Sequence, residues 1–153
     1  MAGEILKEIS ELIRPKLREL GKVRTPIGRF IIGTDEGDIH DIGKNIVVTI
    51  AEAAGFEVID LGVDVSPSKF VEAIKQYNPD IVRMSCLITV GIDSMKKTVN
   101  AIRQAGLREK VKIIIGGGRV DQYACEYVNA DAWTNSAAKG IRIMLKWMEE
   151  KKR

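Results

Sequence analysis

The chain has 153 residues, 45% of them hydrophobic, and a net charge of +3 from 24 basic and 21 acidic residues. This length predicts one domain whose core needs no metal or disulfide to hold it, and the balanced charge predicts no binding to nucleic acid. No apolar run reaches the roughly 18–20 residues that cross a bilayer, the N-terminus does not resemble a secretory signal, and the two cysteines form no CxxC motif. We therefore expect a cytoplasmic protein with no membrane partner.

The first 26 residues are predicted to form a helical segment and linker ahead of the main domain, which we place at residues 27–153. Apolar residues recur on one stripe of a helix over residues 4–20, and Pro15 should kink or divide that helix because proline lacks a backbone donor. The segment therefore offers one kinked helix or two short ones.

From residue 29 onward, short apolar runs alternate with amphipathic segments. In chain order the predicted elements are strand 29–33, helix 41–54, strand 56–61, helix 66–77, strand 80–87, helix 92–105, strand 111–115, helix 121–128, strand 130–133 and helix 136–151. Five strand–helix units with nearly all-apolar strands are typical of a parallel sheet with helices on both faces. We predict an α/β protein with a three-layer, doubly wound, five-stranded parallel sheet of the flavodoxin-like or Rossmann-like kind.

Ligands of such folds bind outside the carboxyl ends of the strands, so the loops at that edge are the first candidates for a site. The loop at residues 33–43 holds four acids and lacks the GxGxxG spacing of a dinucleotide site. Its carboxylates would repel a pyrophosphate or a flavin phosphate. A phospho-receiver shares this architecture but needs an acceptor aspartate after the third strand, where Ser85 stands. These departures argue against nucleotide, flavin and phospho-receiver sites.

The same loop contains His40, the only histidine of the chain. Asp38 stands two residues earlier, so its carboxylate can accept from Nδ1–H and leave Nε2 free to bind a metal. No second histidine and no thiolate pair completes a tetrahedral site, so a metal here would have to bring its other ligands, as a macrocycle does. Gly43 leaves room for a large flat group. The alternative is an ordinary surface histidine without a ligand.

The spacing of three edge motifs points to a family. Asp38-x-His40-x-x-Gly43, Ser85-x-Leu87 and Gly116-Gly117 together resemble the three-part signature of cobalamin-binding domains. The surrounding residues 37–47, 60–65 and 84–89 are similar to the corrinoid domain of cobalamin-dependent methionine synthase and to the small corrinoid proteins of anaerobic methyltransferase systems. The resemblance covers about residues 28–150, nearly the whole chain.

This resemblance implies cobalamin as the cofactor, and it implies a role for each motif residue. His40 would replace the cofactor's own benzimidazole as the lower cobalt ligand, and Asp38 would orient it. The displaced nucleotide tail would pass between the sheet and a helix. The remaining cofactor-binding residues implied are Gly43 beside the corrin, Ser85, Leu87 and Thr89 along the tail, and Gly116, Gly117 and Gly118, which would give the tail room. No residue is implied to be catalytic.

Two features depart from the family pattern. Gly91 stands where the family usually has a hydroxyl that extends the Asp–His pair. The methyl-transfer branch generally carries a helical bundle over the upper face of the corrin, and the residues before the first strand are too few for a four-helix cap. We therefore expect a partner to cover that face, or no cover at all.

The resemblance implies a corrinoid protein that carries a methyl group between partner methyltransferases, as a subunit rather than a complete enzyme. One alternative is the cobalamin-binding subunit of a carbon-skeleton mutase, although residues 41–43 and 87–89 look more like the methyl-transfer branch. Another is a cobalamin carrier or sensor without catalysis. The methyl donor, the methyl acceptor and the oligomeric state stay open.

Overall fold

The structure is a computed structural model that describes residues 26–38, 42–86 and 90–152. The predicted N-terminal helix, His40, Leu87 and Thr89 lie outside these ranges.

Five parallel strands form one sheet in the order β2-β1-β3-β4-β5. The strands are β1 (Arg29–Thr34), β2 (Glu57–Asp60), β3 (Ile81–Ser85), β4 (Lys112–Gly116) and β5 (Ala132–Thr134). The chain starts in the middle of the sheet, moves to one edge, and returns past β1 to build the other side. This is the predicted doubly wound parallel sheet, and the prediction of the fold class is confirmed.

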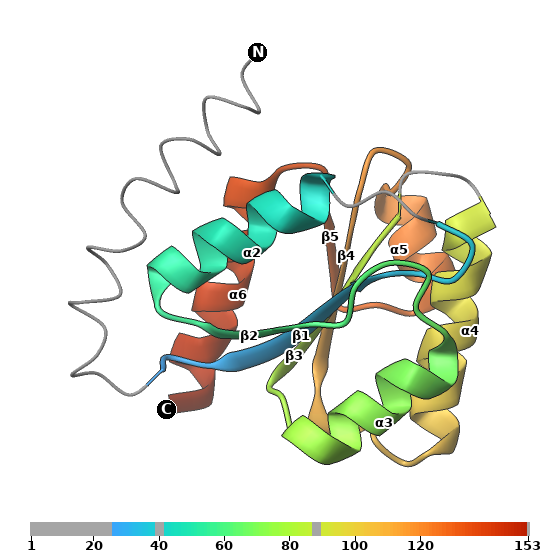
Figure 1. The fold of residues 1–153 in the computed structure, drawn as a ribbon, viewed down its shortest axis with the longest axis horizontal. Coiled ribbons are helices and arrows are strands. Elements are labelled where there is room, and N and C mark those ends of the chain that lie inside the picture. Colours follow the sequence, from blue (N-terminus) through green and yellow to red (C-terminus); the bar gives the residue numbers. More distant parts are fainter. Residues whose placement is uncertain (1–25, 39–41, 87–89, 153) are drawn as a thin grey trace.

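Helices cover both faces of the sheet and complete the three layers (Figure 1). The helices are α2 (Ile42–Ala54), α3 (Pro67–Tyr77), α4 (Val90–Gln104), α5 (Gln122–Val128) and α6 (Ala137–Lys152), with a single 3-10 turn, η1 (Arg108–Lys110). α2 and α6 lie together on one face, and α3, α4 and α5 lie on the other (Figure 1). None of the described helices is long and apolar enough to cross a membrane.

Alternating side chains of the strands divide the apolar interior into two cores. In β1, Phe30 and Ile32 pack with α2 and α6, whereas Ile31 packs with the helices of the opposite face. All three side chains are fully buried. This alternation follows from the two-residue period of a strand, and it explains why strands buried on both faces appear in the sequence as continuous apolar runs.

The ends of the helices follow capping signals in the local sequence. Ser66 caps α3 by accepting from the backbone N–H of Lys69, as its place before Pro67 predicts. Asn78 and Asn129 end α3 and α5 in the left-handed conformation, a role that asparagine fills less often than glycine. The turn η1 was not predicted because a single turn carries no hydrophobic period.

The order of the strands fixes where a ligand can bind. β1 lies between β2 and β3, so the connections that leave β1 and β3 run to opposite faces of the sheet. The loops that follow β1 and β3 therefore diverge. Open α/β sheets bind ligands at such a point, where the strand order reverses. The loop with Asp38 and the segment after Ser85 both begin there.

Candidate functional site

The loop after β1 is held in place by the segment that follows β2. The backbone N–H of Gly37 donates to Asp64 Oδ1 at 2.8 Å, and the backbone N–H of Asp64 donates to the carbonyl of Asp38 at 3.0 Å. Thr34 adds two backbone bonds to the same segment, one to Gly62 and one from Val65, each 2.9 Å long. Asp38 is 1% exposed. The predicted orienting carboxylate therefore lies in a loop whose backbone is fixed to residues 62–65 by four hydrogen bonds.

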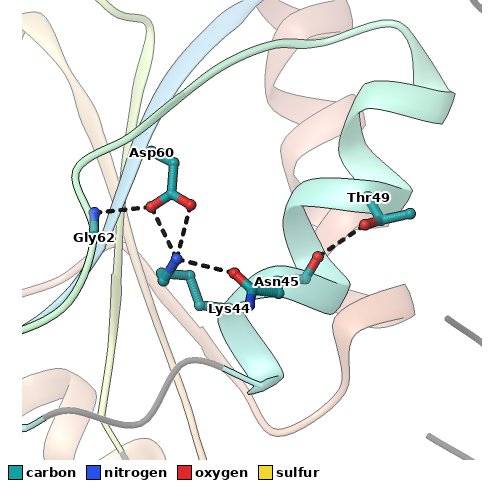
Figure 2. Close-up of polar contacts among 5 residues, drawn as sticks. All are labelled: Lys44, Asn45, Thr49, Asp60 and Gly62. Atoms are coloured by element: carbon teal, nitrogen blue, oxygen red, sulfur yellow. Dashed lines mark hydrogen bonds and ion pairs between the residues drawn. The ribbon is translucent and has the colours of Figure 1, made fainter. Parts of the chain in front are cut away.

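An ion pair ties the start of α2 to the end of β2 (Figure 2). Lys44 Nζ lies 2.7 and 2.9 Å from the two carboxylate oxygens of Asp60, and it also donates to Asn45 Oδ1 (Figure 2). Asp60 Oδ1 in turn accepts from the backbone N–H of Gly62 (Figure 2). The Lys44 side chain is only 4% exposed. These residues stand in two of the stretches that carry the family resemblance, and their tertiary role is to join those stretches.

Backbone pairing places the next two motifs beside each other. Ser85 ends β3, and its register partners are Thr34 on β1 and Gly116 on β4. The carbonyl of Ser85 accepts from Asp35 N–H, and the carbonyl of Gly116 accepts from Cys86 N–H. Asp38, Ser85 and Gly116 thus belong to one edge of the sheet, as predicted. Their contact with a cofactor stays a prediction, as do the roles of His40, Leu87 and Thr89, which the structure does not describe.

The glycines at this edge differ in what surrounds them. Gly43 is exposed and has open space where a side chain would begin, so it leaves room at the loop. Gly117 has a φ of +130°, and a Cβ there would stand 1.7 Å from the carbonyl oxygen of Cys86. Its lack of a side chain is thus required by the close approach of two backbones. Gly118 is exposed.

Burial raises the pKa of two titratable groups next to this loop. Asp35 is fully buried, and neither of its carboxylate oxygens has a hydrogen-bond partner among the described residues. Burial raises the pKa of Asp35 well above the usual range, and the nearby Thr98 hydroxyl offsets part of that rise. The hydrogen bond that this hydroxyl donates goes to the carbonyl of Ser94. Burial also raises the pKa of Cys86 to about 12, so its thiol is a small core side chain, as expected, and not a nucleophile.

Sequence reasoning missed one charged residue at this site. Arg83 lies in the middle of β3 and is 4% exposed, and its Nε and Nη1 have no hydrogen-bond partner among the described residues. Burial lowers its pKa to about 10, so the guanidinium stays charged at neutral pH. The signal was an arginine inside an otherwise apolar strand, which we had interpreted only as part of the strand.

A cavity of about 380 Å³ lies at the opposite end of the sheet, beside the amino ends of β3, β4 and β5. Four of its charged side chains form two ion pairs: Lys151 contacts Asp80, and Arg108 lies 3.2 Å from Asp131. These charges are already neutralised, and the cavity is remote from the loops that carry the motifs.

Comparison with known proteins identifies the family. The model of the B12 binding domain matches residues 28–139. The chain belongs to the B12-binding domain family. Cobalamin is therefore its cofactor.

This B12-binding domain has relatives among corrinoid proteins. It is 39% identical over 140 residues to trimethylamine corrinoid protein 2 of Methanosarcina acetivorans, covering 92% of the chain and 64% of that relative. A cobalamin-binding protein from Desulfitobacterium hafniense DCB-2 has 40% identity and a TM-score of 0.88, with coverage of 96% and 71%. The monomethylamine corrinoid protein of Methanosarcina barkeri has 33% identity and a TM-score of 0.79, with coverage of 95% and 68%. The chain thus spans about two thirds of the length of these relatives.

The described residues fit a corrinoid. Gly43 leaves open space at the loop, since no described atom lies within 4 Å of a Cβ built there. Arg83 presents a buried cation with unused donors beside Gly116. A large flat group with an anionic extension matches these two features. The described residues hold no cluster of three or more His, Cys, Asp or Glu side chains that could bind a metal ion.

Proposed function

We propose that this chain binds cobalamin with its benzimidazole detached and with His40 on the cobalt, and that it carries a methyl group between partner methyltransferases. The observation that supports this most directly is the loop around Asp38. Asp38 is buried, and its own carbonyl and the preceding residues Thr34 and Gly37 are hydrogen-bonded to residues 62–65. A carboxylate fixed in this way can set the tautomer of a histidine two residues later.

Each residue has a part in holding the cofactor. Asp38 would accept a hydrogen bond from Nδ1–H of His40, which would leave the unprotonated Nε2 available to the metal. Asp64, Asp60 and Lys44 keep the loop and the start of α2 against the sheet. Ser85, Leu87 and Thr89 would line the path of the nucleotide tail, and the glycine turn at residues 116–118 would border it. When bound, the corrinoid supplies a cobalt centre that can accept and release a methyl group.

The methyl donor we propose is a methylated amine, because the relatives are named for trimethylamine and monomethylamine. The partners are then a methyltransferase that loads the corrinoid and another that unloads it. A role as the cobalamin subunit of a mutase, or as a carrier or sensor, predicts no methyl transfer with any such partner.

Electron paramagnetic resonance tests the ligand. The chain is loaded with hydroxocobalamin, reduced to the cob(II)alamin form, and measured with ¹⁴N-protein and ¹⁵N-protein. We expect the axial nitrogen coupling to change with the label and to disappear in His40→Ala. If the axial nitrogen coupling is the same in ¹⁴N-protein and ¹⁵N-protein, the cobalt ligand does not come from the protein, and the assignment of His40 is refuted.

Transfer is tested separately. The loaded chain is reduced and mixed with amine methyltransferases and their mono-, di- or trimethylamine substrates, with a methanol methyltransferase as the comparison. We expect methylation of the corrinoid with at least one amine system. Methylation only with the methanol system would refute the donor class, and methylation with none would favour a carrier or a mutase subunit.

A further inference from the structure

Arg83 occupies a position where none of the described residues offers it a counter-charge. The row across the sheet at this level is Asp60, Ile32, Arg83, Ile114 and Ala132, so both direct neighbours of the arginine in the sheet are apolar. The side chain lies on the face that α2 and α6 cover and is 4% exposed. Its Nε and Nη1 are buried without a hydrogen-bond partner in the described part of the chain.

Two glycines make the space that the guanidinium fills. A Cβ at Gly116 would stand 2.6 Å from Nη2, and a Cβ at Gly140 in α6 would stand 2.5 Å from Nη1. Thr134 also lies near but is occupied, since its hydroxyl donates to the carbonyl of Ser136 and accepts from the backbone N–H of Ser136. The surroundings therefore admit the guanidinium without binding it.

No described carboxylate pairs with Arg83. Asp60 binds Lys44, and Asp35 lies over the opposite core, next to Cys86 and Thr98. A buried charge without a partner lowers stability, and an apolar side chain of similar volume serves a core better. An arginine at position 83 thus lowers the stability of the empty chain, and it becomes favourable when a bound ligand supplies an anion.

The position of Arg83 indicates which anion. It stands two residues before Ser85 on the same side of β3, and it touches Gly116, so it adjoins two of the three motifs. Cobalamin carries amide side chains and a single anionic group, the phosphodiester of its nucleotide tail. We propose that Arg83 is a further cofactor-binding residue whose guanidinium donates to that phosphodiester. This rests on the proposed function, in which the tail is detached from the cobalt.

The test measures equilibrium binding of hydroxocobalamin, cobinamide phosphate and cobinamide, which differ in the tail. Cobinamide phosphate keeps a phosphate but lacks the base, and cobinamide lacks both. We expect Arg83→Met to weaken the first two roughly 10- to 100-fold, as for loss of a charged hydrogen bond, and to leave cobinamide unchanged. Arg83→Lys keeps the charge and should recover part of the loss. Arg108→Met, at the other end of the strands, is the matched control and should change none of the three affinities.

Thermal unfolding of the empty chain separates binding from structure. Arg83→Met should unfold at the same temperature as the original chain or higher, because it removes an unpaired buried charge. A lower unfolding temperature with equal losses for all three corrinoids would show a structural role and overturn the proposal. Equal affinities of Arg83→Met and the original chain for cobalamin would also overturn it.

Two further outcomes assign failure to its source. If Arg83→Met weakens cobalamin but not cobinamide phosphate, the group that Arg83 contacts is the base, and the phosphodiester assignment is wrong. If the original chain binds cobinamide as tightly as cobalamin, the tail adds nothing, and both the detached-tail binding mode and the role of Arg83 are refuted. Normal cobalamin binding with an unaffected Arg83→Met refutes only the present inference.

Discussion

At the scale of single residues, the candidate site is distinguished by ionisable side chains that are buried. Asp38, Asp35 and Arg83 are all buried, yet they differ in their surroundings. Asp38 lies in a loop fixed by backbone hydrogen bonds, and burial raises the pKa of the nearby Asp35. Arg83 lies on the opposite face of the sheet from Asp35, and its Nε and Nη1 have no hydrogen-bond partner among the described residues. Ionisable side chains are seldom fully buried, and buried groups with shifted pKa values are typical of functional sites.

Asp38→Asn should weaken the bond between His40 and cobalt without abolishing cofactor binding. An amide accepts a hydrogen bond less strongly than a carboxylate does, so the imidazole becomes a poorer ligand, and such losses typically amount to about 10- to 100-fold in ligand affinity. The axial nitrogen coupling of the cob(II)alamin form measures the ligand, and equilibrium titration measures the cofactor. Asp93→Asn, on the exposed part of α4 beside Tyr127, serves as the control. Unchanged coupling in Asp38→Asn would remove Asp38 from its orienting role.

Asp35→Asn should stabilise the empty chain at neutral pH more than at acid pH. The pKa of Asp35 is raised in the folded state, so its contribution to stability is fully present below the unfolded pKa of about 4 and is lost as the pH rises toward the folded pKa. An asparagine has no such loss. The difference in unfolding free energy, variant minus original, should therefore grow in favour of asparagine between pH 4.5 and 7, by at most about 1.4 kcal/mol per pH unit. Urea titrations at several pH values measure it, and a constant difference would show that the pKa is not raised.

At the scale of elements, short segments that are distant in the sequence constrain one another's side chains. Lys44 at the start of α2 needs Asp60 at the end of β2, and the turn at Gly117 needs the backbone of Cys86 at close range. The same reasoning explains Gly91 near the start of α4. A Cβ at Gly91 would stand 2.5 Å from Cys86 Cβ, so the hydroxyl usual in the family has no room beside a cysteine.

Gly91→Ser should therefore destabilise the chain by about 1–3 kcal/mol through overpacking, and Cys86→Gly should relieve much of that cost. The four proteins of this cycle are compared by urea unfolding. We expect a favourable coupling between the two substitutions of about 0.5–3 kcal/mol, as for residues in direct contact. Strictly additive effects would mean that α4 moves aside to accept the serine and that the contact does not limit position 91.

At the scale of the whole molecule, one sheet serves two cores. Ile31 and Ile32 are consecutive and fully buried, and they contact opposite helix layers. Because both cores share the strands, neither layer can lose its packing without exposing the sheet that supports the other. The loops at the carboxyl edge are anchored to this packed sheet, because Thr34, Ser85 and Gly116 lie at the ends of its three central strands.

Ile31→Val and Ile32→Val should each lower the free energy of unfolding by about 0.5–1.5 kcal/mol and leave a single transition. The pair is matched, since the same methyl-sized change is made on the two faces of one strand. Near-ultraviolet and far-ultraviolet circular dichroism should give coincident curves for both variants. Separate transitions in either variant would show that the two layers unfold independently.

The amino-acid sequence alone predicts the five strands, the helices that connect them, the fold class and the loops at the carboxyl edge. Strand and helix periods, the pair Ser66–Pro67 and the motif at residues 38–43 act over a few residues, so they can be interpreted without knowing the rest of the molecule. Three contacts emerge only when the chain is folded: Lys44 with Asp60, Gly91 with Cys86, and Arg83 with Gly116 and Gly140. These contacts depend on strand order, register and the choice of covering helix. Strand order, register and covering helix are set by packing between segments far apart in the chain, so a local sequence pattern cannot predict them.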